Sequence, residues 1–446
     1  MQGQPDMLDL MTLMEKAPLP DKRLCKRAQL MVQSLVRGHS ATSSGLLAPA
    51  NRTPESFTRG AYRFFDHEQV TLAALQAPVQ QALEQLVPVG SRAYVAHDVS
   101  VLNYTGHQRK EDLIAVGNDH TYGYELYQAL VISADGKPLA AAVTELRNNQ
   151  GLLSTQSEAV LPFVDHLEQT ERAVDAVEQM LPGRDLVHLC DREFDDLALH
   201  RHIGQRQQVI RCQHLSRVVH VHGEPRSLRS QVQKVKLRHV GEVVRRVEGG
   251  NKSYQLWVGE TKVDFVGCAQ RGVNKKKRKP QKGEALRMRV VVSELRHESD
   301  KTLQWVLLTN LKESAEEVVG GDLLRWKVER IFWLAKLGFR LEHWHQESAE
   351  RVGRRLLLVQ LAAMAVYQLM QHSAPETEEL RQRLALLGGW PGRPRVPIGP
   401  TVLMRGVMIF IAAVQLCQQL GQRELFQMAR SLEPLLGPIL CRADEL

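Results

Sequence analysis

The hydrophobic and polar positions predict helices at both ends of the chain and a region of strands between them. Near the N-terminus, apolar residues recur at helical spacing over Leu8–Lys16. A second helix is predicted to begin after Asp21, because aspartate is a preferred N-cap residue. We therefore expect residues 1–70 to form a helical domain.

Between residues 71 and 215 the pattern alternates between helical and strand-like segments, which indicates an α/β domain. A helix is predicted over Thr71–Leu86. Two strands are expected to meet at the turn Ala134–Gly136, because an Asp-Gly pair favours a tight connection. The strands are expected at Ala93–Ala96, Tyr122–Ile132, Pro138–Thr144, Leu186–Leu189 and Gln208–Cys212, and two further helices at Ser157–Met180 and Asp195–Ile203.

Short β-like runs, separated by charged and glycine-containing turns, occupy residues 217–304. This composition predicts a β-rich segment inserted into the α/β domain. The runs are Val218–His222, Val232–Leu237, Tyr254–Val258, Val263–Val266 and Leu286–Val292.

Beyond Lys336 the chain becomes helical and apolar again. The Pro/Gly-rich stretch Gly388–Pro400 reads as a linker. Thr401–Leu416 is the most membrane-like segment, but it contains Arg405 and is shorter than the roughly 20 apolar residues that a span needs, so we predict a buried helix and no membrane partner. The helices are expected at Arg354–Met370, Glu378–Leu387, 401–420 and about 423–435.

The length of the chain suits about three domains. Its composition gives a modest positive charge. The chain has 446 residues, 43% of them hydrophobic, and a formal net charge of +8. Part of that charge is gathered in one run, which is a solvated loop, a DNA-backbone contact or a nuclear import signal. We favour DNA contact, by neutralisation of phosphates. The run is Lys275, Lys276, Lys277, Arg278 and Lys279.

Six scattered cysteines without a Cys-x-x-Cys pair argue against a structural zinc site or a disulfide framework. The N-terminal residues lack the pattern of a signal peptide. We therefore expect a protein of the reducing cytoplasm.

Candidate chemistry comes from three carboxylates. Arg325, Glu329 and Lys336 are separated by four and seven residues, so on one continuous helix they would share a narrow face. Asp98 and Asp191 each follow a strand-like run. Alone, such residues are usually turn, cap or solvated ion-pair residues. Together, two acids at strand ends and one on a late helix can converge on a pair of divalent metal ions and perform phosphoryl transfer on nucleic acid.

The amino-acid sequence around these acids resembles that of the DDE transposases of the bacterial cut-and-paste subgroup with the Tyr-Arg-Glu-Lys signature. The similar blocks run in order over more than half of the chain. They are Gly60–Phe64, His97–Tyr104, Cys190–Glu193, Trp305–Thr309, and Arg325–Glu329 with Lys336.

One position departs from the family pattern. The signature Tyr should stand three residues before Arg325, where this chain has Asp322. In the family that Tyr contacts the DNA backbone. Either the phosphate sits differently here, or Asp322 faces away from it, or activity is reduced.

The resemblance implies an α/β fold: a ribonuclease H-like catalytic core over residues 71–372 with a β-rich insertion at about 217–304. A helical DNA-binding domain (1–70) and a helical dimerisation domain (373–446) would flank it. Asp98, Asp191 and Glu329 would bind two Mg²⁺ ions, for which Mn²⁺ can substitute. The partners would be transposon-end and target DNA and a second copy of the chain, in a bacterial, nucleoid-associated setting.

Further residues are candidates for DNA contact. Arg325 and Lys336 would hold phosphates. Trp305 and Trp326 match the two family tryptophans that support an extruded base, with core packing as the alternative. His97 is either a base or a structural hydrogen-bonding residue. The other candidates are Arg211 for phosphate, Arg192 and Glu193 behind the acids, and Lys22, Arg23, Lys26, Arg27, Tyr62 and Arg63 on an N-terminal surface that is otherwise a solvated basic face.

Three classes of function fit these residues. The first is an active transposase that cuts at transposon ends, through a DNA hairpin, and joins them to target DNA. The second is a catalytically impaired, transposase-derived DNA-binding protein or inhibitor. The third is a nuclease without strand transfer.

Overall fold

The computed structural model describes residues 9–37, 54–117, 120–204, 206–247, 250–267, 285–298, 300–372, 374–393, 396–414, 417, 421 and 423–424. The chain divides into two compact units. The first comprises Met1–Gln69, Lys336–Arg340 and Leu358–Leu446; the second comprises Val70–Ala335 and Leu341–Leu357. The long helix α10 (Ala349–Gln371) contributes to both. Among the described residues, no helix is long and apolar enough to cross a membrane.

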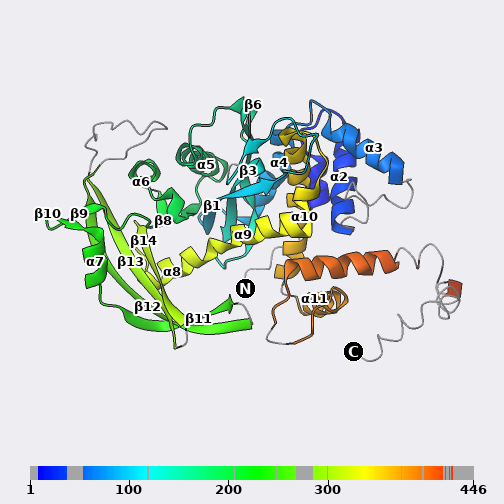
Figure 1. Cartoon of the computed structure of the whole chain (residues 1–446). Coiled ribbons are helices and arrows are strands. Elements are labelled where there is room, and N and C mark those ends of the chain that lie inside the picture. Colours follow the sequence, from blue (N-terminus) through cyan, green and yellow to red (C-terminus); the bar gives the residue numbers. More distant parts are fainter. Residues whose placement is uncertain are drawn as a thin grey trace. The chain divides into compact units, whose positions relative to one another are not determined.

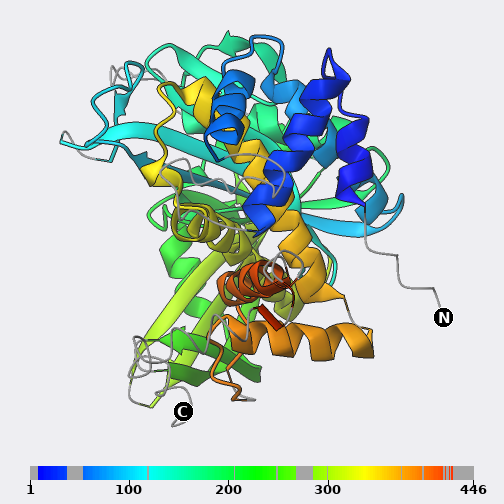
Figure 2. The same cartoon turned by 90° about the vertical axis from the view of Figure 1, so that its right-hand side faces the viewer.

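The first unit is helical where the structure describes it. Asp21 caps the second helix as predicted, because its carboxylate accepts a hydrogen bond from the Arg23 N–H at 2.8 Å. Near the C-terminus, α11 runs across the view of Figure 2, with the following helix (residues 400–414) seen end-on beside it. The described helices at both ends of the chain were therefore predicted correctly in type. The prediction of a buried helix over Thr401–Leu416 was wrong in its burial, because Ile409, Phe410 and Val414 are 43%, 46% and 37% exposed. The N-terminal helices are α1 (Leu10–Glu15), α2 (Lys22–Arg37) and α3 (Pro54–Phe65), and α11 is Pro375–Leu387.

The second unit is built on one mixed sheet of 14 described strands, with helices on its faces (Figure 1). The strand order is β10-β9-β12-β13-β14-β8-β7-β1-β3-β4-β5-β6, with β11 paired to β12 and β2 to β3. The predicted α/β class is confirmed. The first strands are β1 (Arg92–Asn103), β2 (Ile114–Ala115), β3 (Tyr122–Ser133), β4 (Pro138–Asn148), β5 (Gly151–Ser154), β6 (Ser157–Leu161), β7 (Asp185–Cys190) and β8 (Gln207–Arg211); β9 (Val218–Val221), β10 (Glu224–Ser227), β11 (Arg238–Val247), β12 (Gly250–Phe265), β13 (Leu286–His297) and β14 (Asp300–Thr309) follow.

The strands at the centre of the sheet combine two directions. β1 pairs antiparallel with β3, and β3 with β4. On its other side β1 pairs parallel with β7, and β7 parallel with β8. The parallel ladder between β1 and β7 ends at the pair His97–Cys190. The residues after this pair therefore leave the ladder at the same edge.

Helices cover both faces of this central part. On one face, α8 (Ala315–Leu324) packs Val318 and Val319 onto β7, β8 and β14. On the other, α5 (His166–Met180) and α6 (Leu197–Ile203) pack onto Cys190 and Ile210. Since side chains alternate along a strand, odd positions of β7 and β8 face α8 and even positions face α5 and α6. A third helix, α4 (Leu72–Leu86), packs on β4.

The β-rich insertion extends the same sheet rather than forming a separate one. β14 pairs with β8 at one side and with β13 at the other. Its core is a set of apolar side chains under the short helix α7 (Leu228–Lys234), among them Val219, Val263 and Val290. In Figure 1, α8 begins next to β12 and β13, with which it is in contact, and continues toward β8 and β1 at the centre of the sheet.

Several predicted elements were wrong. Ser157–Met180 is not one helix: Ser157–Leu161 forms β6 and the helix begins only at His166, after the N-cap Asp165. Val232–Leu237 belongs partly to α7, since Ser227 caps a helix there. The two short runs between Tyr254 and Val266 are one strand, β12. The predicted basic loop 275–279 and the last predicted helix (423–435, except two residues) lie outside the described residues.

Candidate active site

Two of the predicted acids leave the sheet at adjacent positions. Asp98 and Asp191 directly follow the last parallel pair, His97–Cys190. Asp98 was predicted to follow the end of a strand, which was wrong, because β1 continues past it to Asn103 along β3. Asp98 does lie just beyond the end of the parallel pairing between β1 and β7. Asp191 caps the short 3₁₀ turn η1 (Arg192–Phe194). Both carboxylates reach Arg325, which lies between α8 and α9 (Trp326–Trp333), so both side chains project on the face that these helices cover.

The third acid comes from α9 (Trp326–Trp333), which packs on β1 and β3. The predicted unbroken helix from Asp322 to Lys336 was wrong. Arg325 joins α8 to α9 through a tight turn, in which its N–H donates to the Asp322 carbonyl at 3.1 Å and its carbonyl accepts from the Val328 N–H at 3.1 Å. After α9, a π-helical segment (Leu334–Gly338) contains Lys336, which belongs to the other unit. The shared helix face is confirmed for Arg325 and Glu329, whose side chains are in contact, and stays a prediction for Lys336.

The structure brings the three carboxylates around one guanidinium. Arg325 lies 3.4 Å from Asp98 (Nη1–Oδ2) and 3.3 Å from Asp191 (Nη2–Oδ2). Its Nη2 lies 3.2 Å from Oε1 of Glu329, one turn further along. The Arg325 side chain is only 1% exposed. Its position was predicted as a phosphate contact, whereas here it neutralises the acids.

Burial and the neighbouring charges shift the pKa of Asp98. Burial raises the pKa of its carboxyl to about 7; Arg325 opposes the shift, and the charges of Glu329 and Asp191 add to it. A carboxyl with a pKa near neutrality, close to two other acids, makes Asp98 a candidate functional residue, and structural ion-pair networks shift pKa values as well.

The donor set fits a hard divalent cation in kind, because it consists of carboxylate oxygens. As the side chains stand, however, no group of three or more Asp, Glu, His or Cys is arranged to hold a metal ion within the part of the chain that is described. Arg325 lies among the acids instead.

Asp322, the departure from the resembling pattern, has a partner inside the protein. Arg211 donates to it through Nε (2.9 Å to Oδ1) and Nη2 (2.6 Å to Oδ2). Both residues are buried, and the hydrogen bonds outweigh burial and raise the pKa of Arg211. One of the three alternatives was that Asp322 faces away from the phosphate. In the structure its side chain is directed at Arg211. This pairing also neutralises Arg211, which was predicted to contact phosphate.

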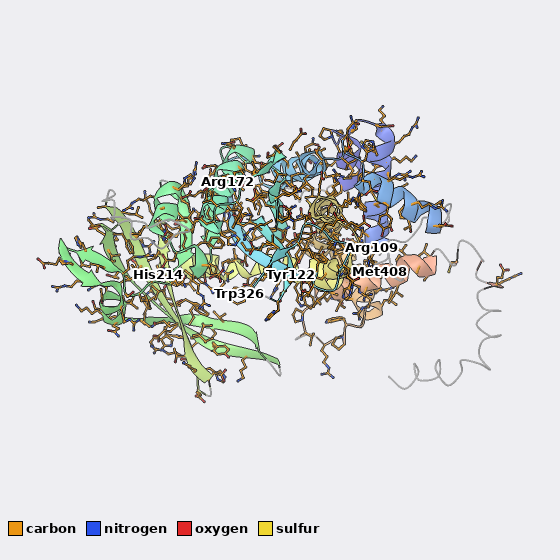
Figure 3. All side chains as sticks on the ribbon, turned by 45° about the horizontal axis from the view of Figure 1, so that its top comes forward. Arg109, Tyr122, Arg172, His214, Trp326 and Met408 are labelled. Carbon is orange, nitrogen blue, oxygen red and sulfur yellow. The ribbon has the colours of Figure 1, made fainter. Side chains whose placement is uncertain are left out.

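Two indole rings flank the Arg211 guanidinium. Its central carbon lies 5.4 Å from the ring of Trp305 and 5.7 Å from that of Trp326. Trp305 is partly buried against the core of α8. Trp326, labelled in Figure 3, is 38% exposed. Exposure leaves Trp326 accessible for base stacking, while Trp305 combines core packing with the cation contact.

His97 lies on the opposite face from Asp98. Its ring nitrogens bond to the Tyr127 hydroxyl (2.8 Å) and to His188 (2.9 Å), and His188 in turn lies 3.2 Å from Glu178. Burial, then the neighbouring His188, hold the pKa of His97 well below its usual range. Of the two predicted roles, the structural hydrogen-bonding one agrees with this geometry.

Arg192 and Glu193 are exposed on η1. The residue that supports this loop is Asp195, which sequence reasoning missed. Its buried carboxylate accepts from the Gln213 and His214 N–H groups (2.8 and 3.1 Å) and from Arg217 (2.8 Å). It thereby joins the segment after β7 to the segment after β8. The run Asp195-Asp196 was a signal only for a helix cap, a role that Asp196 fills.

The predicted N-terminal contacts lie on α2 and α3. Lys22, Arg23 and Lys26 are exposed, whereas the Arg27 guanidinium lies against Gly60 of α3, where a side chain would clash with it. The exposed Tyr62 and Arg63 lie on α3. No comparison or contact tests their binding to DNA, so this stays a prediction.

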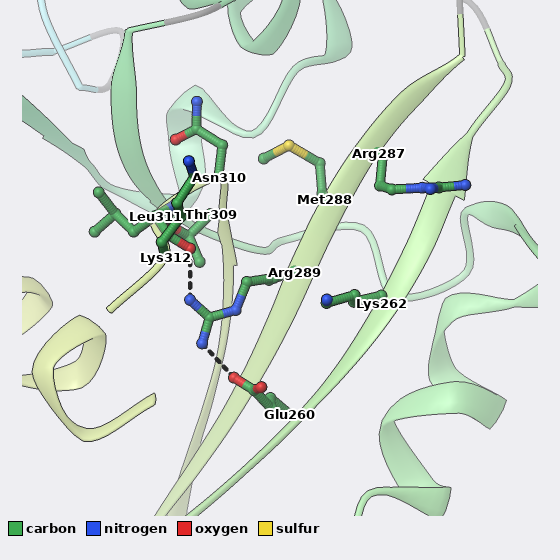
Figure 4. Close-up of a pocket in the computed structure, with 9 residues that line it drawn as sticks. All are labelled: Glu260, Lys262, Arg287, Met288, Arg289, Thr309, Asn310, Leu311 and Lys312. Atoms are coloured by element: carbon green, nitrogen blue, oxygen red, sulfur yellow. Dashed lines mark hydrogen bonds and ion pairs between the residues drawn. The ribbon is translucent and has the colours of Figure 1, made fainter. Parts of the chain in front are cut away.

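A pocket of about 370 Å³ lies away from the acids, on β12, β13, β14 and the loop that follows (Figure 4). Arg289 reaches Glu260 and the Glu313 carbonyl there, the latter at 2.7 Å. Arg287 pairs with Asp264 at 2.9 Å. Since both arginines are already paired, the pocket offers less free positive charge than its composition suggests.

Comparison with known proteins leaves the family open. No family model matches the chain, and no curated protein sequence matches it.

Proposed function

We propose that this chain is a DDE transposase: it cuts at transposon ends in a metal-dependent reaction, through a hairpin, and joins the ends to target DNA. The observation that carries the proposal is the convergence of Asp98, Asp191 and Glu329 within 3.4 Å of one guanidinium. These acids come from a strand, a loop and a late helix, at sequence positions far apart. A solvated surface ion pair does not require such convergence.

The strand order supports the ribonuclease H-like part of the proposal. The central strands run in the order β4-β3-β1-β7-β8. The first three are antiparallel and the last two join in parallel, with α5 and α6 in the connections. The β-rich insertion between Asp191 and Glu329 agrees with the resemblance as well.

Each side chain then has a task. Asp98 and Asp191 would present carboxylates from neighbouring positions, and Glu329 would complete the set from α9. When bound, two Mg²⁺ ions would activate a water or 3′-hydroxyl and stabilise the leaving oxygen of an in-line displacement. The exposed indole of Trp326 would stack on an unpaired base at the hairpin, a contact that contributes roughly 1–3 kcal/mol.

One observation favours the second class, an impaired copy or inhibitor. Asp322 and Arg211 stand at positions proposed to meet the DNA backbone, and they bind each other. A chain that neutralises its own phosphate contacts would bind DNA more weakly there than its resembling family does.

The test is cleavage of DNA that carries the element's own ends, in Mg²⁺ or EDTA, on a denaturing gel. Metal-dependent hairpins and joined 3′ ends, lost in Glu329→Gln and kept in Glu158→Gln, are expected. Glu158 is a suitable control because it is an exposed acid on β6, outside the proposed site. Nicks without joining would indicate the nuclease class, and a DNA shift without any cleavage, even in Mn²⁺, would indicate the inhibitor class.

A further inference from the structure

Arg325 cannot perform its proposed role from the position that it occupies. The family resemblance implies that Arg325 holds a DNA phosphate, and the proposed function asks the three acids to hold metal ions. Its side chain is 1% exposed and lies among those acids. A phosphate cannot reach the guanidinium there, and metal ions compete with it for the same oxygens.

The contacts of Arg325 are loose for charged groups. Its distances to the carboxylates are 3.2–3.4 Å, whereas charge-assisted N–H···O bonds are usually about 2.7–2.9 Å long. Its Nε is buried and has no hydrogen-bond partner among the described residues. A buried donor without a partner is energetically unfavourable, since it has lost its hydrogen bonds to water. Arg325 therefore has contacts to gain by moving to another anion.

The neighbouring Arg211 provides the contrast. It binds a single carboxylate, that of Asp322, through two donors at 2.6–2.9 Å. That pair matches in charge and geometry, so exchange would cost it well-formed bonds. Arg325 instead shares one positive charge among three acids, Asp98, Asp191 and Glu329. The cluster retains excess negative charge that a divalent cation would neutralise better.

The Arg325 guanidinium lies close to a partly exposed side chain, that of Trp326. The central carbon of the Arg325 guanidinium is 5.3 Å from the ring of Trp326, which is partly exposed. Since Arg325 is buried and the Trp326 ring beside it is 38% exposed, the ring marks the direction in which the surface lies nearby. The same surface carries the indole that would meet the DNA.

We infer that Arg325 is an exchangeable counterion of Asp98, Asp191 and Glu329, which keeps divalent metal ions from the acids until a DNA phosphate draws the guanidinium away. This inference rests on the proposed function. Metal and DNA then promote each other's binding, because both favour the state in which Arg325 has left the acids. Premature metal loading, and cleavage without correctly placed DNA, are thereby suppressed.

The experiment measures Mn²⁺ affinity by electron paramagnetic resonance in the absence of DNA. Arg325→Gln should bind Mn²⁺ at least about tenfold more tightly than the unmodified protein, within the about 5- to 150-fold range of typical couplings. The matched control is Arg330→Gln, which removes a cation from the exposed side of the same helix. It should bind Mn²⁺ as the unmodified protein does.

Two results would overturn the inference, and they separate it from the proposed function. Equal Mn²⁺ affinity in the unmodified protein and Arg325→Gln would remove the counterion role and leave the metal site intact. Failure of a folded Arg325→Gln to bind Mn²⁺ at all would remove both, since the acids would then form no metal site.

A second measurement covers a variant that does not fold. In the unmodified protein, a short DNA duplex should increase Mn²⁺ affinity, and Arg325→Lys, which keeps the charge but loses the planar fork, should show an intermediate affinity without DNA. If the duplex binds and leaves Mn²⁺ affinity unchanged, the coupling is absent and the inference is wrong.

Discussion

Asp322 and Arg211 form a buried bidentate ion pair, with 2.6 Å between Oδ2 and Nη2 and side chains 3% and 11% exposed. Removing one partner of such a pair leaves an uncompensated charge in the interior. Asp322→Asn should therefore lower the free energy of unfolding by about 3–5 kcal/mol, measured by urea denaturation. Asp322→Leu combined with Arg211→Met should recover most of this loss, because neither charge remains. A single variant as stable as the unmodified protein would show that the pair contributes nothing.

Asp322→Tyr tests the departure from the resembling family directly. The phenol does not neutralise Arg211, so this variant should also lose stability, but it leaves Arg211 free for a phosphate. We expect tighter DNA binding with a steeper dependence on salt, because one more cation contacts the backbone. The measurement is DNA affinity over a range of salt concentrations. An unchanged slope, in a folded variant, would mean that Arg211 does not reach DNA.

The raised pKa of Asp98 predicts a pH-dependent stability. In the folded protein the pKa is about 7, against 3.8 for the unperturbed group, so the folded state binds more protons between these values. Stability should fall as pH rises from about 4 to 7, by up to the order of 4 kcal/mol at about 1.4 kcal/mol per pKa unit. Asp98→Asn should remove this slope and be more stable than the unmodified protein at pH 8. Urea denaturation across this pH range, with Glu193→Gln as control, checks it; the same slope in Asp98→Asn would assign it to another group.

The sequence was sufficient to find the three acids because each stands in a local motif of a recognisable element. Asp98 and Asp191 follow apolar runs that proved to be neighbouring strands. Their common face follows from the alternation of side chains, once the parallel register is known. The register itself, which aligns His97 with Cys190, depends on pairing between distant segments and could not be read from either one.

The partners of these residues were not predictable, because they come from other elements. Arg211 and Asp322 are separated by 111 positions, and neither carries a local signal of the other. The predicted unbroken α-helix from Asp322 to Lys336 was wrong because a tight turn at Arg325 and a π-helical segment after Trp333 interrupt its regular hydrogen bonding. Helical spacing predicts neighbours only within an unbroken α-helix.

Asp195 anchors the loop behind the acids, so its loss should affect stability. Burial would raise the pKa of its carboxyl, but His200 and Arg217 outweigh burial and hold the pKa well below its usual range. This contribution is present above pH 4 and is lost as the pH falls below about 4. Asp195→Asn should cost about 3–5 kcal/mol at pH 7, with the difference from the unmodified protein shrinking in acid. Urea denaturation of both proteins at pH 7 and in acid measures this difference in stability. A difference that stays constant with pH would contradict an origin in the charge of Asp195.

Gly406 allows the helix at residues 400–414 to touch α11. A β-carbon at this position would lie 1.6 Å from the Leu384 carbonyl oxygen, which is backbone and cannot rotate away. Gly406→Ala should therefore separate the two helices and destabilise the first unit by about 1–3 kcal/mol. The control is Gly320→Ala in α8, where a β-carbon meets nothing within 4 Å; it should stabilise the chain by about 0.5–1 kcal/mol, because alanine favours a helix interior. Circular dichroism during urea unfolding distinguishes the two signs, and a neutral Gly406→Ala would show that the helix contact tolerates a shift.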